Sequence, residues 1–447
     1  KMALKLWLGP SGSGKTHELY AYALREAEKD PNGNYIVVVP EQFTLSTQLK
    51  LVSMSEKKGI LNVDVLSFAR LAYRVFEEVG FKDTGGMIID DMGKNLILRH
   101  LAGRMEEKLT HLSSNMKRLG YITEVKSVIS EFMQYGINPP MLNELSGKAK
   151  EAGRGTLFSK LKDIELLYRA FDEFIAGRYT SSEELLSRAS HAVYESGKIK
   201  KSVIFFDGFT GFTPVQYLFI KALMENSRGV HVSVLYDTRC DKDHSLEHEL
   251  FYLSDTTIAK LKKQAKGICP VLEDEKISDD IPKRFSGSSS HMLIHLERNI
   301  FREDSKTYVI KNSDNEPEGT GKADKITKDC EKATSRVNEE IVVFSALQPL
   351  DEVRNAAARI RELVKNEGMR YKEIGIVTGD HECYFPLIER IFSKYEIPFF
   401  LDSTRPVLLN PLIEFMRAAV DVISEDYSYE AIFRYLRSSM TDNETAD

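Results

Sequence analysis

The segment Gly9-Pro10-Ser11-Gly12-Ser13-Gly14-Lys15-Thr16 matches the phosphate-binding pattern G-x-x-x-x-G-K-[ST] at every defined position. Glycines let backbone N–H groups curl around phosphate oxygens, and the N-terminus of a following helix adds partial positive charge. Lys15 is expected to reach the β- and γ-phosphates of a nucleotide, and the Thr16 hydroxyl can hold Mg²⁺. The alternative is a glycine-rich turn without a ligand, but a position between a strand and a helix favours nucleotide binding.

A second candidate for nucleotide chemistry is Asp207, which follows the apolar run Ile204–Phe206. A carboxylate at the end of a strand can hold Mg²⁺, although it can equally cap the next turn. Nucleotide hydrolysis also needs a group that positions or deprotonates the attacking water, and the residue after Asp207 is Gly208. We therefore predict weak or vestigial binding of ATP and Mg²⁺ and assign no catalytic residue.

A parallel sheet would position both the phosphate loop and Asp207. Short apolar runs predict its strands at Leu4–Leu8, Tyr35–Val39, Ile60–Leu66, Val203–Phe206 and Val230–Tyr236. Amphipathic helices are predicted at Thr16–Lys29 and after the cap residue Ser67, and Thr213-Pro214 has the residue types of a helix start. This alternation is typical of an α/β fold of the P-loop NTPase class.

The rest of the chain divides by pattern. Residues 85–197 show helical patterns only, for example at Met92–Leu109 and Leu157–Ala176, which predicts an inserted helical subdomain. Residues 304–338 are polar and predict a flexible linker. A second α/β unit is expected at 339–447. Its strands are predicted at Ile341–Ala346, Ile374–Thr378 and Ile397–Leu401, and its helices at Asp351–Val364 and Tyr384–Tyr395.

The composition is that of an ordinary globular chain, with 42% hydrophobic and 29% charged residues among 447. The net charge of −6 excludes a histone-like polycation, so nucleic acid would bind in a local groove. No apolar stretch approaches the roughly 18 residues of a membrane span. The cysteines lack paired metal-ligand spacing, which favours a reducing cytoplasm and argues against a metal site: Cys240, Cys269, Cys330 and Cys383.

Several segments, taken in their order along the chain, resemble the UvrD-like helicases of superfamily one and, more closely, the AddB subunits of AddAB helicase–nucleases. Besides the phosphate loop, they are Val39–Thr44, Ser67–Val75, Asp207–Pro214, Arg370–Val377, Tyr395–Phe400 and Asn410–Phe415. The resemblance implies a helicase-like sheet domain at 1–84 and 198–303, the helical insert at 85–197, and the start of a second, truncated helicase-like domain at 339–447.

The resemblance also implies a function. Such subunits pair with an AddA-like helicase–nuclease subunit, process duplex DNA ends for recombinational repair, and scan single-stranded DNA for the Chi hotspot with an inactivated helicase fold. Helicases read adenine with a glutamine segment before the phosphate loop, and too few residues precede Gly9 to hold one. The end at Thr441–Asp447 suggests a fragment, so neither the nuclease nor the iron–sulfur cluster of the C-terminal part is expected here.

By the resemblance, the positions that read the hotspot are Gln42, Thr44, Phe68, Arg70 and Tyr73. Further candidate DNA contacts lie at the end of the strand that leads to Asp207: Phe209, Thr210 and Phe212. The residue types fit, because aromatic faces stack on bases while glutamine and arginine bond base edges. Core packing explains Phe68 about as well as stacking does, since Leu71 and Ala72 follow at helical spacing.

Two other classes of function remain open. A small-molecule P-loop enzyme, such as a kinase, usually fits one compact domain and keeps its catalytic acids, which the helical insert and Gly208 disfavour. A scaffold with a helicase-like fold that binds only its partner would show no affinity for an oligonucleotide.

Overall fold

The computed structural model describes residues 3–80, 87–112, 119–176, 178–237, 246–277, 282–285, 291–302, 305–308, 341–403, 407 and 410–438. The chain forms two compact units, Lys1–Ile341 and Val342–Asp447. The linker predicted at 304–338 lies almost entirely outside the described residues.

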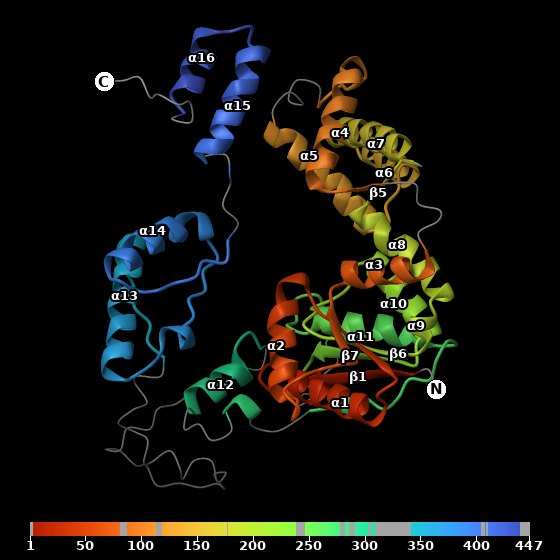
Figure 1. Ribbon diagram of the computed structural model, residues 1–447, viewed down its shortest axis with the longest axis vertical. Coiled ribbons are helices and arrows are strands. Elements are labelled where there is room, and N and C mark those ends of the chain that lie inside the picture. The colour runs from red at the N-terminus through yellow and green to blue at the C-terminus, as the bar shows by residue number, and fades with distance from the viewer. Residues whose placement is uncertain are drawn as a thin grey trace. The chain divides into compact units, whose positions relative to one another are not determined.

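The first unit is built on a six-stranded sheet whose described strands all run parallel (Figure 1). In spatial order the strands are β3 (Val63–Leu66), β2 (Asn34–Val38), β6 (Ser202–Phe206), β7 (Gly229–Leu235), β1 (Leu4–Gly9) and β8 (Glu275–Lys276). The predicted parallel α/β sheet is therefore confirmed. The sequence did not predict β8, which is too short to show a pattern.

Helices cover both faces of this sheet. On one face, α1 (Lys15–Lys29) and α2 (Thr44–Met54) share a core with Trp7 and Phe205. On the other face, the helices that pack over Ile204 and Phe206 are α3 (Phe68–Val79), α8 (Ser182–Ala192), α10 (Pro214–Asn226) and α11 (Tyr252–Ala265). Shorter elements of the unit are η1 (Glu41–Phe43), α9 (Gly197–Lys200), η5 (Lys283–Phe285) and α12 (His291–Asn299).

Two helix starts follow the predicted capping chemistry. The Ser67 hydroxyl accepts a hydrogen bond from the backbone N–H of Arg70 at the start of α3. At the start of α10, the Thr213 hydroxyl and the Gln216 side chain form a reciprocal capping box, with Pro214 in the first turn. These caps fix where the chain turns from a strand end into a helix.

The helical insert contains α4 (Asp91–Arg104), α5 (Leu119–Gln134), α6 (Pro139–Glu151) and α7 (Gly155–Ile175), which Figure 1 shows as one bundle. The prediction of helices only was wrong in one detail. β4 (Met87–Ile89) and β5 (Tyr179–Ser181) form a parallel pair, and runs this short show no period in the sequence. The buried side chains of α8 join the core of the sheet instead, so the assignment of 182–197 to the insert does not match the packing.

In the second unit, α13 (Pro349–Asn366) and α14 (His381–Lys394) pack through Val353, Ile360 and Phe392. The helix predictions there are confirmed, but the three predicted strands are wrong. The segments at 341–346, 374–378 and 397–401 adopt no strand, and Val377 is 98% exposed. A strand needs a neighbour to take its backbone hydrogen bonds, and none pairs with these segments among the described residues.

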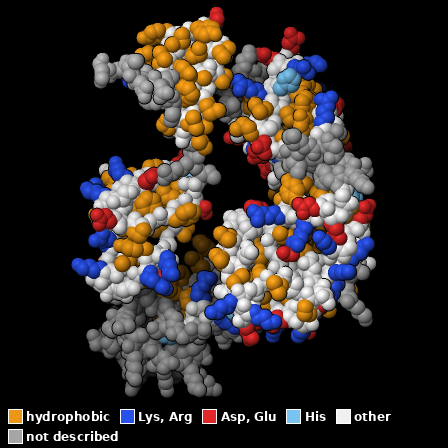
Figure 2. Space-filling model, viewed as in Figure 1, with side chains coloured by type: hydrophobic (Ala, Val, Ile, Leu, Met, Phe, Trp, Pro, Cys, Tyr) orange, Lys and Arg blue, Asp and Glu red, His pale blue; other side chains and the backbone are white. Residues whose placement is uncertain are grey.

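The last described helices are α15 (Pro411–Ser424) and α16 (Tyr429–Leu436). Figure 2 shows hydrophobic side chains gathered over this part of the chain. The exposed apolar side chains of these helices are Leu412, Met416, Val420, Ile423, Tyr429, Ile432, Phe433 and Leu436. Small residues, Ala418 and Ala431, are the buried ones in these helices.

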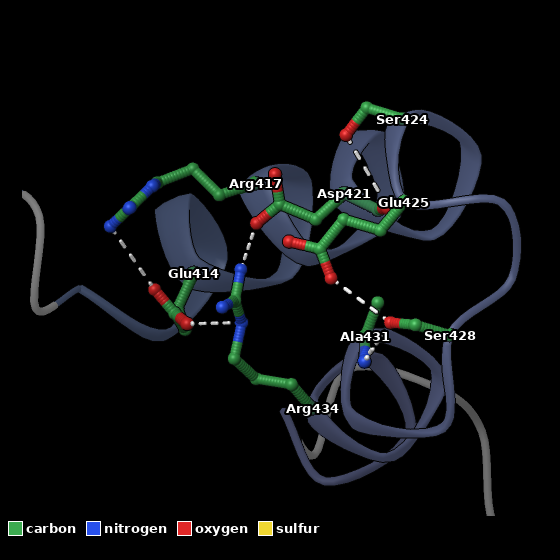
Figure 3. A network of polar contacts seen from close by, with 8 residues as sticks. All are labelled: Glu414, Arg417, Asp421, Ser424, Glu425, Ser428, Ala431 and Arg434. Atoms are coloured by element: carbon green, nitrogen blue, oxygen red, sulfur yellow. Dashed lines mark hydrogen bonds and ion pairs between the residues drawn. The ribbon is translucent and has the colours of Figure 1, made fainter. Parts of the chain in front are cut away.

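Polar contacts tie the two helices together (Figure 3). Arg434 on α16 forms ion pairs with Glu414 and Asp421 on α15, and Arg417 reaches Glu414 as well. The Ser428 hydroxyl donates to Glu425 across the turn at 2.9 Å. The rings of Phe415 on α15 and Tyr435 on α16 stack on each other, with centroids 4.9 Å apart. Ion pairs and this ring contact therefore join the two helices, while many of their other apolar side chains are exposed.

Candidate nucleotide and nucleic-acid site

The phosphate loop leads from β1 into α1, as predicted. Gly12 and Gly14 have φ angles of 77° and 96°, a left-handed backbone that glycine adopts without steric cost. The Lys15 ammonium donates to the Pro10 carbonyl at 3.3 Å. Burial lowers the pKa of Lys15, an effect that the Asp207 charge opposes and the Arg284 charge reinforces. A desolvated cation of this kind is stabilised by an anionic ligand such as phosphate.

The end of β6 brings Asp207 to the phosphate loop. The Thr16 hydroxyl donates to Asp207 Oδ1 at 3.2 Å, and the Tyr20 hydroxyl donates to Oδ2 at 2.9 Å. A carboxylate and a hydroxyl side by side supply the hard oxygen ligands that Mg²⁺ prefers. The Ser13 hydroxyl is buried in the same loop with no protein partner among the described residues.

The residue after Asp207 is Gly208, which carries no side chain. Its φ is 79°, and a Cβ added there would lie 3.4 Å from Cδ of Pro40. A side-chain-bearing residue would be strained in this left-handed conformation. The local backbone is thus suited to glycine and poorly suited to an acid that activates water.

A distant segment covers the phosphate loop. The Arg284 backbone N–H donates to the Gly12 carbonyl at 3.0 Å, and a Cβ added at Gly14 would lie 3.0 Å from Cδ of Lys283. The Lys283 ammonium pairs with Glu18 at 2.7 Å, which lowers the pKa of that carboxyl. The sequence did not predict the place of these two cations, because nothing local in it relates residues 283–284 to the loop.

The candidate DNA residues follow three neighbouring strands. Since β3, β2 and β6 are adjacent and parallel, the segments after them share one edge of the sheet. Gln42 lies exposed in η1, and the Thr44 hydroxyl donates to the Glu41 carbonyl at 3.0 Å. Arg70 on α3 reaches the Glu41 carboxylate at 3.1 Å, which ties the segment after β2 to the segment after β3.

Aromatic and hydroxyl side chains are exposed at the same edge. Tyr73 on α3 and Thr210 after β6 are both exposed. Phe43, which the sequence analysis did not choose, is 48% exposed in η1. Its place between Gln42 and Thr44 was visible in the sequence, but its exposure was not, because an aromatic residue after a strand is usually core.

Phe68 lies in the core of the sheet domain. It is 7% exposed, and its ring lies 5.4 Å from that of Phe206 and 6.4 Å from that of Phe219. Phe209 and Phe212, both half-buried, join it at 5.2 and 6.1 Å. Core packing, the alternative that the sequence left open, describes Phe68, and the structure does not support it as a free stacking face.

Other features bear on the chemistry of the described residues. No group of histidine, cysteine or acidic side chains there could hold a metal ion as a cluster of three or more. Cys269 is buried and Cys383 exposed, whereas Cys240 and Cys330 lie outside the described residues. Among the helices described, none is long and apolar enough to cross a membrane.

Comparison with known proteins gives a consistent result. A family model described as "ADDB, N-terminal" matches residues 6–297. A protein of Lachnoclostridium phytofermentans, named as a subunit of an ATP-dependent helicase/deoxyribonuclease, is 36% identical over 99% of this chain and 36% of its own length. A protein of the same name from Acetivibrio thermocellus is 32% identical over 100% of this chain, and one from Clostridium tetani is 30% identical over 99% of it. In each case the match covers 36% of the relative's own length. The chain thus spans about a third of the length of these relatives, and it belongs to the AddB family.

Proposed function

We propose that this chain is the DNA-scanning part of a helicase–nuclease subunit. It acts in the cytoplasm with an AddA-like partner, processes duplex DNA ends for recombinational repair, and scans single-stranded DNA for the Chi hotspot. The names of its relatives support a role within a multi-subunit ATP-dependent helicase and deoxyribonuclease. Nuclease activity and the iron–sulfur cluster are proposed for the C-terminal part of such subunits and not for these residues.

One observation carries the DNA-binding proposal. The segments that follow β2 and β3 present an exposed amide, a guanidinium and two exposed aromatic rings along one edge: Gln42, Arg70, Phe43 and Tyr73. Aromatic faces accept any base by stacking, whereas amide and guanidinium groups can select base edges. Such a mixture supports a site that holds a single strand and discriminates among sequences.

We propose that the phosphate loop binds ATP weakly. Lys15 would contact the β- and γ-phosphates, and Thr16 and Asp207 would hold Mg²⁺, whose charge would offset that of the phosphates. Arg284 adds positive charge near Lys15, whereas the charge of Lys283 is paired with that of Glu18. Turnover is expected to be negligible because Gly208 offers no group to activate water. Lys15→Ala should weaken nucleotide affinity at least about tenfold, the usual order for losing a charged hydrogen bond.

The DNA proposal is tested by fluorescence anisotropy with a labelled single-stranded oligonucleotide across a salt series. We expect binding that weakens as salt rises, because phosphate contacts release counterions. Tyr73→Ala should weaken binding by about 1–3 kcal/mol if a base stacks there. Leu49→Ala on α2 is the matched control, since it removes an exposed apolar side chain.

The scaffold hypothesis makes the opposite prediction. No oligonucleotide binding by the folded chain at low salt, together with binding of an AddA-like partner, would reject the proposed DNA site.

A further inference from the structure

The Tyr20 hydroxyl lies between the candidate nucleotide site and α2. Tyr20 is 2% exposed on α1, and its hydroxyl is 2.9 Å from Asp207 Oδ2 and 3.5 Å from the Thr47 hydroxyl. Thr47 is itself buried on α2. A chain of hydrogen bonds therefore runs from Thr16 through Asp207 and Tyr20 to Thr47.

The direction of these bonds follows from the groups. An ionised carboxylate only accepts, so the single hydroxyl proton of Tyr20 goes to Asp207. Thr47 must then donate to the Tyr20 oxygen. Burial and the nearby Asp207 charge both raise the pKa of Tyr20, which keeps that proton in place.

Asp207 is thereby held from two sides. Thr16, a residue of the phosphate loop, binds Oδ1, whereas Tyr20 binds Oδ2 from the interior. If Thr16 turns its hydroxyl to a metal ion, Tyr20 remains to fix the carboxylate and keep Oδ1 aimed at the loop. If Tyr20 served only to fill space in the core, its hydroxyl would not need to lie beside Asp207 Oδ2.

Thr47 brings this series of hydrogen bonds to α2, the helix that follows the candidate DNA-reading turn. It lies one turn into α2, whose first residue is Thr44 and which directly follows the η1 turn with Gln42 and Phe43. A helix moves as a rigid element, so a shift at Thr47 is carried to its first turn.

We infer that Tyr20 is a positioning residue for Asp207 and that its contact with Thr47 couples metal–nucleotide binding to the DNA-reading turn before α2. This inference rests on the proposed nucleotide and DNA sites.

The positioning role is tested with Tyr20→Phe. Affinity for a fluorescent ATP analogue is measured with Mg²⁺ and with EDTA, in the wild type and the variant. The ratio of the two affinities should fall roughly tenfold in the variant, as for a lost bond to a charged group, while the affinity in EDTA stays near the wild-type value. An equal loss in both conditions would mark Tyr20 as merely structural and overturn the inference.

The matched control is Tyr35→Phe. Tyr35 is also 2% exposed, and its hydroxyl donates at 2.8 Å to the Glu26 carbonyl near the other end of α1. It should leave the Mg²⁺ dependence unchanged, and a change as large as that of Tyr20→Phe would overturn the inference. Absence of any Mg²⁺-dependent binding in the wild type would instead reject the proposed nucleotide site itself.

The coupling is tested separately with Thr47→Val, which keeps the shape of the side chain. The affinity for single-stranded oligo-dT is measured with and without the Mg²⁺-bound analogue. In the wild type we expect the analogue to change the affinity for oligo-dT by about fivefold or more, as is typical of linked sites. Thr47→Val should bring that factor close to one, and an unchanged factor in a folded variant would overturn the coupling.

Discussion

Two regions along the same edge of the sheet differ in how firmly their side chains are held. Around Asp207, the hydroxyls of Thr16 and Tyr20 occupy both carboxylate oxygens in a buried setting. After β2 and β3, Gln42 is exposed and Arg70 is tied to Glu41 by an ion pair that is more than half exposed. The side chains of the first region are held in place by buried hydrogen bonds, whereas those of the second can adapt to a ligand.

This difference implies that substitutions act by different routes. A buried, interlocked group contributes to folding and binding together, so its loss lowers both. An exposed side chain at the DNA edge has little packing to lose, so its substitution should change binding alone.

The largest expected effect separates two aromatic residues of α3. Phe68→Ala empties a ring position in the core and should lower the free energy of unfolding by about 3–5 kcal/mol. Tyr73→Ala on the exposed face should lower it by less than about 1 kcal/mol. Chemical denaturation measures both. Similar losses in the two variants would show that Tyr73 is core as well, which would break the comparison.

The stability of the sheet domain should depend on pH through a buried histidine, His231. His231 on β7 accepts a hydrogen bond from Trp7 Nε1 at 3.3 Å, and its ring stacks on that of Phe205. Burial, with a smaller effect of Lys5, lowers the pKa of His231 to about 3. The unfolded histidine binds a proton below about pH 6.5 while the folded one does not, so stability is lost as pH falls through this range.

Between pH 7 and pH 5 the expected loss from this histidine is about 2 kcal/mol. Denaturation at the two pH values, compared with His231→Gln, isolates the contribution because the variant lacks the titrating group. Equal pH dependence in both proteins would mean that the pKa of His231 is the same in the folded and unfolded states.

The smallest effect is expected for Arg70→Ala. The ion pair with Glu41 is exposed on both sides, so its loss should change the free energy of unfolding by less than about 1 kcal/mol. Affinity for single-stranded DNA should nevertheless fall. Unchanged DNA affinity in this variant would remove Arg70 from the proposed site.

Local sequence was enough to predict the phosphate loop and the strands around it. The glycine pattern, the apolar runs and the caps at Ser67 and Thr213 are each specified within a few residues. By contrast, the covering cations Lys283 and Arg284 and the Tyr20–Thr47 contact depend on residues far apart in the chain.

The second unit shows the opposite failure. The apolar runs near Val343, Val377 and Phe400 predicted strands, yet they are exposed and unpaired in the part of the chain that the structure describes. Apolar, β-branched sequence makes a segment able to pair, but only a neighbouring strand makes it a strand. Phe68 likewise depends on residues outside its own segment, since helical spacing alone could not decide between a core ring and a stacking face.

In the function proposed for this chain, the exposed edge after β2 and β3 holds single-stranded DNA. Photo-cross-linking of the folded chain to an oligonucleotide that carries 5-iodouracil, followed by mass spectrometry of the linked peptides, tests it most directly. We expect cross-links at Phe43 and Tyr73, the exposed rings of that edge. Cross-links confined to the second unit, for example to the apolar side chains of α15 and α16, would contradict it.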